Sequence, residues 1–91
     1  MKTLPPTVLP YKQTPIFTEE TVPEGLLNSH NTKAGVWAKI VVLEGTLVYR
    51  ILEPNIEAIK LSPQIDGIIE PTIKHEVAPD GHVRFFVEFY R

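Results

Sequence analysis

Apolar and polar residues alternate along the middle of the chain as expected for β-strands that bury one face. Two runs of strand-forming residues, 36–43 and 46–52, are joined by Glu44 and Gly45. A two-residue connection that contains glycine is a strong β-hairpin signal when strand-like runs flank it. The sequence therefore predicts a hairpin whose turn is Glu44-Gly45.

The predicted hairpin has one nearly wholly apolar face and one mixed face. Side chains alternate across a pleated strand, so the apolar face must be buried. Lys39 and Arg50 would lie opposite each other on the mixed face, and two like charges favour a face that meets water. The face that we expect in the core consists of Val36, Ala38, Ile40, Val42, Leu47, Tyr49 and Ile51.

Shorter strand-like segments lie on both sides of the predicted hairpin. No stretch has sustained helical periodicity, and turn residues recur about every eight to twelve residues, as is typical of a β-sandwich or barrel. The pattern predicts an all-β domain of about eight short strands over residues 11–91, preceded by a proline-rich extended arm at residues 1–10. The other segments expected to form strands or brief apolar stretches are 11–17, 25–30, 56–61, 65–70, 72–78 and 83–90.

Composition narrows the class of protein. Ninety-one residues make a single small domain, and the formal charge of −2 without a Lys/Arg cluster argues against a nucleic-acid partner. The absence of cysteine excludes disulfides and cysteine-based zinc sites. The longest apolar run, residues 40–43, is too short for a membrane span, and prolines interrupt any signal peptide. We therefore expect a soluble, cytoplasmic domain with no membrane partner.

His75 is the most informative candidate residue. Alternation along residues 72–78 places its side chain on the inward face with Ile73 and Val77. An inward imidazole needs a hydrogen-bond partner or a metal, because burying it unsatisfied costs free energy. Two interpretations stay open: a core histidine bonded to backbone or water, and a metal ligand.

His30 gains meaning only if it lies next to His75 in space. A closed sheet could bring these early and late segments together. The third histidine, His82, follows Asp80 and Gly81 in a predicted turn, where we expect it to be solvated.

The last strand carries one carboxylate, Glu88. Phe85, Val87 and Phe89 form the apolar face of that strand and are expected in the core, which places Glu88 at the surface. If the strand instead turned Phe86 and Glu88 into a cavity, Glu88 would be a candidate third metal ligand or base.

These residues together resemble a known family. The chain is similar to the cupin-like domain at the N-terminus of some tellurite-resistance methyltransferases, which also occurs as a free-standing small bacterial protein. The resemblance implies a double-stranded β-helix, the jelly-roll barrel of cupins, with a pocket that can hold a metal. It extends over residues 11–91 and rests on the ordered set His30, Gly35, Trp37, Gly45, Pro71 and His75.

The resemblance implies a divalent metal, such as zinc, iron or nickel, held by His30 and His75. The other ligand positions of the cupin pattern fall near Thr32, Ala34 and Ala38, which do not bind metal. Two imidazoles are one short of the three protein ligands of a catalytic zinc. Glu88, water or a partner chain would therefore complete the site.

Three hypotheses of function follow. The first is a metal- or small-ligand-binding module, linked by resemblance to tellurite or oxidant stress, in which a small molecule or oxyanion takes the open metal position. Its ligand-binding candidates are Tyr49, Phe86 and Trp37. The second is a metal-dependent cupin enzyme of isomerase or oxygenase type.

The third hypothesis is a metal-free homodimeric interaction domain. Its interface would consist of Trp37, Val41, Val48 and Leu52. A methyltransferase domain is not expected in these residues, because binding of a methyl donor needs an α/β sheet with a glycine-rich loop.

Overall fold

The computed structural model describes the whole chain, residues 1–91, and it is almost entirely β-structure. All strand pairs are antiparallel and belong to a single sheet, which confirms the all-β prediction. The structure contains no helix with the length and apolar character of a membrane-spanning segment. The elements are β1 (Pro10–Gln13), β2 (Phe17–Thr18), the single-turn helix α1 (Glu24–Leu27), β3 (Trp37–Ile51), β4 (Glu57–Leu61), β5 (Gly67–Ile69) and β6 (His75–Tyr90).

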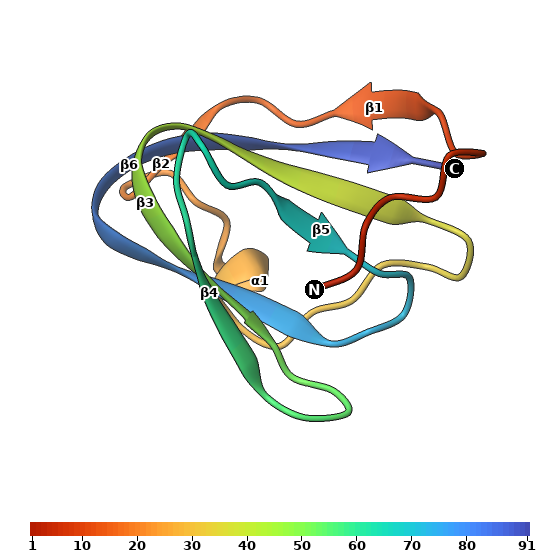
Figure 1. Ribbon diagram of the computed structural model, residues 1–91. Coiled ribbons are helices and arrows are strands. Elements are labelled where there is room, and N and C mark those ends of the chain that lie inside the picture. Colours follow the sequence, from red (N-terminus) through yellow and green to blue (C-terminus); the bar gives the residue numbers. More distant parts are fainter.

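Two long strands, β3 and β6, organise the sheet. They pair along almost their full lengths, from Trp37 opposite Tyr90 to Ile51 opposite His75. Figure 1 shows both strands curving together at the left of the view and doubling back, so that one strand pair runs through both the upper and the lower part of the molecule. The register shifts around Gly45, which marks an irregularity of the β-bulge kind at the bend.

The bend divides the sheet into two halves, which we call leaves. The first leaf combines the N-terminal half of β3 and the C-terminal half of β6 with β1, β2 and β5. The second leaf combines the remaining halves with β4 and with His30, which forms an isolated bridge to His75. The leaves face each other across the core, since the Tyr49 hydroxyl on the second leaf donates to the Ile68 carbonyl on the first at 2.8 Å.

The predicted hairpin at Glu44-Gly45 is wrong. The chain continues through both residues as part of β3, and Gly45 pairs with Val83 on β6. Gly45 has φ of 76°, and a Cβ at this position would collide with the carbonyl oxygen of His82. The glycine is therefore needed for a bend and a close backbone approach rather than for a chain reversal.

The predicted turn at residues 79–81 lies within β6 in the same way. Thr46, beside the bend in β3, donates to the carbonyl of Asp80 at 3.3 Å. The two predicted turns are thus the place where both long strands bend together. This accounts for much of the difference between six strands and the predicted eight or so, because two pairs of expected strands are continuous.

Residues 25–30 were expected to form a short strand, and this prediction is also wrong. The segment begins with a single helical turn in which the Leu26 amide donates to the Pro23 carbonyl at 3.0 Å. The side chain of Asn28 donates to the Glu24 carbonyl at 3.0 Å and completes the turn. One turn is too short to show a helical period in the sequence.

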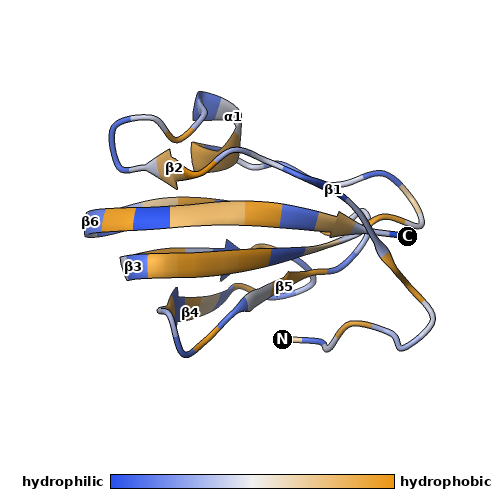
Figure 2. Cartoon of the chain, turned by 90° about the horizontal axis from the view of Figure 1, so that it is seen from above, coloured by the Kyte–Doolittle hydropathy of each residue, from blue (hydrophilic) through white to orange (hydrophobic).

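The core lies between the leaves and contains most of the apolar face that the sequence predicts. Ala38, Ile40, Val42, Leu47 and Tyr49 are buried, whereas Val36 and Ile51 are half-buried. Figure 2 shows the long hydrophobic stretches of β3 and β6, with α1 and β2 beside β6 on the side away from β4.

Candidate functional site

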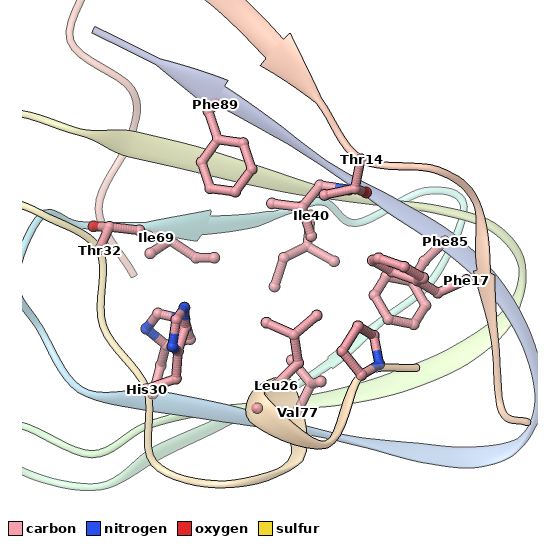
Figure 3. Close-up of a pocket in the computed structure, with 14 residues that line it drawn as sticks. Thr14, Phe17, Leu26, His30, Thr32, Ile40, Ile69, Val77, Phe85 and Phe89 are labelled. Carbon is pink, nitrogen blue, oxygen red and sulfur yellow. The ribbon is translucent and has the colours of Figure 1, made fainter. Parts of the chain in front are cut away.

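A cavity of about 260 Å³ lies between the two leaves. Its walls come from the sheet and from the segment that precedes β3, and Figure 3 shows side chains from both parts around a common open space. Its fourteen lining residues are Thr14, Phe17, Pro23, Gly25, Leu26, His30, Thr32, Ile40, Ile69, His75, Val77, Phe85, Val87 and Phe89.

His75 supplies the most deeply buried polar group of this cavity. Its side chain is on the inward face of β6, as the alternation predicts, and the residue is 2% exposed. Nδ1 lies 3.0 Å from the carbonyl oxygen of Ile73, and the Tyr49 ring packs edge-on with centroids 6.0 Å apart. The other ring nitrogen, Nε2, is buried and has no hydrogen-bond partner in the protein.

The Ile73 carbonyl fixes the tautomer of His75. A carbonyl oxygen can only accept a hydrogen bond, so the proton of a neutral imidazole must sit on Nδ1. Burial lowers the pKa of His75 below its ordinary value of 6.5, and the nearby His30 lowers it further. His75 is therefore neutral near physiological pH, and its Nε2 carries a free lone pair.

His30 lies beside His75 at the edge of the cavity. The two residues exchange backbone hydrogen bonds, each from N to O at 2.8 Å, and their rings are edge to face with centroids 5.4 Å apart. His30 is exposed, whereas His75 is buried. The structure thus brings the two predicted histidines together, one at the rim and one in the wall.

The other predicted metal ligand, Glu88, lies on the opposite face of β6 from the cavity-lining Val87 and Phe89. It is paired across the sheet with Lys39, and its Oε1 accepts a hydrogen bond from the Tyr90 hydroxyl. The histidines and Glu88 are therefore not brought together, and no group of three His, Asp or Glu side chains could hold a metal ion.

The three predicted ligand-binding residues do not line this cavity either. Phe86 and Trp37 are half-buried on the outer face of the first leaf, opposite Val41 and Tyr90. Tyr49 is in the core behind His75 and borders a second hollow of about 350 Å³. The aromatic residues that do line the first cavity are Phe17, Phe85 and Phe89.

Sequence reasoning missed the wall that comes from residues 14–26. Phe17 and Leu26 reach the core from β2 and α1, and both elements are too short to have a periodic signature. The sequence does carry a signal for Phe85 and Phe89, since alternation predicts that their face of the last strand lies in the core. In the structure this face lines the cavity.

The donors present fit a metal centre only in part. The hydrogen bond from Nδ1 of His75 to a backbone carbonyl is the arrangement that orients metal-binding histidines, and it leaves Nε2 free. However, only His30 accompanies His75, which is one short of the usual three protein ligands. The two histidines therefore supply only part of a metal site.

Comparison with known proteins identifies the family. A model described as the TehB-like domain matches residues 12–87. The chain belongs to the TehB-like domain family. This membership confirms the resemblance seen in the sequence, over nearly the same span.

Two curated relatives of this TehB-like domain come from Haemophilus influenzae, and both are named as probable S-adenosyl-L-methionine-dependent methyltransferase TehB. The protein of strain ATCC 51907 / DSM 11121 / KW20 / Rd is 32% identical over 75 residues, and that of strain 10810 is 29% identical over 75 residues. Each match covers 82% of this chain but 22% of the relative. The chain thus matches only a small part of each of these methyltransferases.

Two solved structures share the fold of the TehB-like domain. The crystal structure of TehB from Haemophilus influenzae has a TM-score of 0.85 and 30% identity, with 91% of this chain and 31% of that chain covered. A crystal structure of an Escherichia coli K12 protein has a TM-score of 0.86, with 100% and 97% covered. At 20% identity, the second likeness shows the fold alone.

Proposed function

We propose that this TehB-like domain binds a small, largely apolar molecule in the cavity between its two leaves. The observation that carries the proposal is Nε2 of His75, which is buried without a partner in a residue that is 2% exposed and lines this mostly apolar cavity. Buried polar groups in folded proteins nearly always have a partner, and where the protein supplies none, a bound water, ion or ligand can do so. A bound ligand supplies the missing partner.

The size of the cavity supports this proposal. A dry engineered cavity of about 150 Å³ binds benzene. The cavity of about 260 Å³ therefore has room for a bicyclic aromatic or a branched aliphatic molecule. Phe17, Phe85 and Phe89 would contact such a molecule through ring faces and edges.

The proposal includes a cupin-like architecture. A small double-stranded β-helix holds its ligand between two facing sheets. The two leaves of this chain, which enclose the cavity, are compatible with that arrangement. By family relation, we further propose a part in the response to tellurite or other oxidants, in which this domain recognises a molecule and the methyltransferase chemistry belongs to other domains.

A divalent metal is a second candidate occupant. The carbonyl-oriented imidazole of His75 favours it, because Nε2 is free as in a metal-binding histidine. His30 would be the other protein ligand, and the remaining donors would come from a bound molecule. Zinc, iron or nickel would then bind weakly unless that molecule is present.

The binding test uses benzofuran, a bicyclic probe without a hydrogen-bond donor. Titration into ¹⁵N-labelled protein should shift the amide signals of cavity residues such as Phe85 and Val87 more than those of the outer face. Leu26→Trp should fill the cavity and abolish these shifts. Leu27→Trp is the matched control, because Leu27 is the neighbouring exposed leucine and does not line the cavity.

Three outcomes would count against the proposal: no shift with either benzofuran or its N–H counterpart indole, shifts confined to the outer face, or equal binding by both tryptophan variants. Titration with zinc alone tests whether the occupant is a metal ion. Tight zinc binding that is lost in His75→Leu and unaffected by Leu26→Trp would favour the metal candidate instead.

A further inference from the structure

The polar groups of the cavity wall determine what kind of ligand it can satisfy. The Thr14 hydroxyl already accepts from the Val87 amide at 2.9 Å and donates to the Pro15 carbonyl at 2.9 Å. The Thr32 hydroxyl donates to the Val36 carbonyl at 2.8 Å. Both threonines have therefore used their donors within the protein, and neither can donate to a ligand.

Histidine supplies the remaining polar groups. His30 is exposed at the rim, so water can satisfy its ring nitrogens. The buried Nε2 of His75 has no partner. It carries no proton of its own, because the hydrogen bond to the Ile73 carbonyl keeps the proton of the neutral imidazole on Nδ1. Nε2 of His75 is therefore the one buried side-chain atom here that lacks a hydrogen-bond partner, and it needs a donor.

The charge of the wall points the same way. None of the fourteen lining residues is Lys, Arg, Asp or Glu. A bound anion would lose its hydration without gaining a counter-charge, and it would meet the lone pair of Nε2 rather than an N–H group. Two effects therefore disfavour an oxyanion: it would lose its hydration, and the His75 tautomer offers it a lone pair instead of an N–H group.

We propose that the ligand of this cavity is an uncharged molecule with an apolar body and one O–H or N–H group, which donates a hydrogen bond to Nε2 of His75. This inference rests on the proposed function and narrows the ligand to alcohols, phenols and N–H heterocycles. Oxyanions such as tellurite are disfavoured as occupants of the cavity. His75 is the residue that determines specificity.

Three probes of similar size separate the possibilities. Indole carries an N–H donor, benzofuran has the same shape with a ring oxygen in its place, and benzoate is an anion. Dissociation constants for the wild-type protein near neutral pH come from amide shifts. Indole should bind about tenfold more tightly than benzofuran, because one satisfied buried hydrogen bond is worth about that ratio. Benzoate should bind more weakly than either.

A variant and a direct signal complete the test. His75→Leu puts an apolar side chain in place of the imidazole and removes the acceptor, so the preference for indole should fall to about one. If that variant fails to fold, the ¹⁵N chemical shift of His75 Nε2 in the wild-type protein tests the hydrogen bond instead. It should have the position of an unprotonated nitrogen without ligand, and it should shift with indole but not with benzofuran.

The outcomes distinguish this inference from the proposed function. Equal affinity for indole and benzofuran, or an Nε2 signal that indole does not move, overturns the hydrogen-bond inference and leaves the binding cavity standing. Tighter binding of benzoate than of indole also overturns it. Failure of every probe to bind overturns both the inference and the proposed function.

Discussion

His30 and His75 are joined in two ways. Their backbones exchange two hydrogen bonds of 2.8 Å, and their rings stand edge to face with centroids 5.4 Å apart. The backbone bonds do not depend on either side chain. The His30 ring can therefore be removed while the segment that carries it stays attached to β6, which makes the contribution of that ring measurable.

We expect His30→Ala to raise the pKa of the His75 imidazole. Burial is the largest cause of the lowered pKa, and the His30 ring helps both to cover His75 and to oppose its charge. The measurement is an NMR pH titration of the His75 ring protons. His30→Phe is the matched control, because it keeps an aromatic cover and should leave most of the shift. An unchanged His75 pKa in the alanine variant would mean that His30 does not shield the site.

Gly45→Ala should destabilise the protein much more than Gly81→Ala. Both glycines have φ of 76°, so both substitutions incur the left-handed strain of roughly 1–2 kcal/mol. Only Gly45 also lacks space, since its new Cβ would meet the backbone of His82, whereas a Cβ at Gly81 has no neighbour within 4 Å. Urea unfolding should show a loss above about 3 kcal/mol for Gly45→Ala. Equal losses would contradict the close approach at the bend.

Tyr49→Phe should cost about 1–2 kcal/mol of unfolding free energy. The Tyr49 hydroxyl links the two leaves by donating to the Ile68 carbonyl, and the residue is buried in the core. Burial also raises the pKa of this hydroxyl, so it remains a donor at any physiological pH. Tyr11→Phe is the control, because Tyr11 is exposed. Similar small effects for both variants in urea unfolding would show that the link between leaves contributes little.

Stability should fall as pH rises above about 6.5, and His82 should be the cause. Its Nε2 lies 3.3 Å from Glu44 and its Nδ1 3.4 Å from Glu19, with Arg84 also beside Glu44. The Glu44 hydrogen bond, then the charge of Glu19, raises the pKa of His82 from 6.5. Because the pKa of His82 is higher in the folded than in the unfolded protein, its protonation stabilises the fold at pH values below the unfolded pKa. This stabilisation is lost as pH rises through the folded pKa.

His82→Gln removes that titration, so its unfolding free energy should not fall over this window. The contribution of His75 to the pH dependence of stability has the opposite sign. Its pKa is lowered in the folded protein, so the unfolding free energy falls as pH drops below 6.5. Urea unfolding at a series of pH values separates the two. A slope above pH 6.5 that is the same in wild type and His82→Gln would rule out the His82 pair as its source.

The faces of the central strands could be predicted from sequence, but their connection could not. Alternation placed Ala38, Ile40, Leu47 and Tyr49 on one buried face, and the structure agrees. A two-residue turn and an irregular bend both change the phase of alternation at Gly45. The local pattern is therefore the same for a chain reversal and for a bent strand, and only pairing with β6, distant in sequence, decides between them.

The candidate site shows the same limit. The inward direction of His75 follows from a local alternation, and it is confirmed. The partner of Nδ1 and the isolation of Nε2 depend on the Ile73 carbonyl and on residues from other parts of the chain. Phe17 and Leu26 reach the cavity from a two-residue strand and a single helical turn, which leave no periodic trace. The metal role of the histidines stays a prediction.

The most direct test of the account is the position of indole in a crystal of the protein soaked with it. We expect the ring to lie in the cavity among Phe17, Leu26 and Phe89, with its nitrogen about 3 Å from Nε2 of His75. Indole bound only at the outer face of the first leaf, near Phe86, would contradict the account. So would indole in the cavity with its nitrogen turned away from His75, because the buried acceptor would then remain unsatisfied.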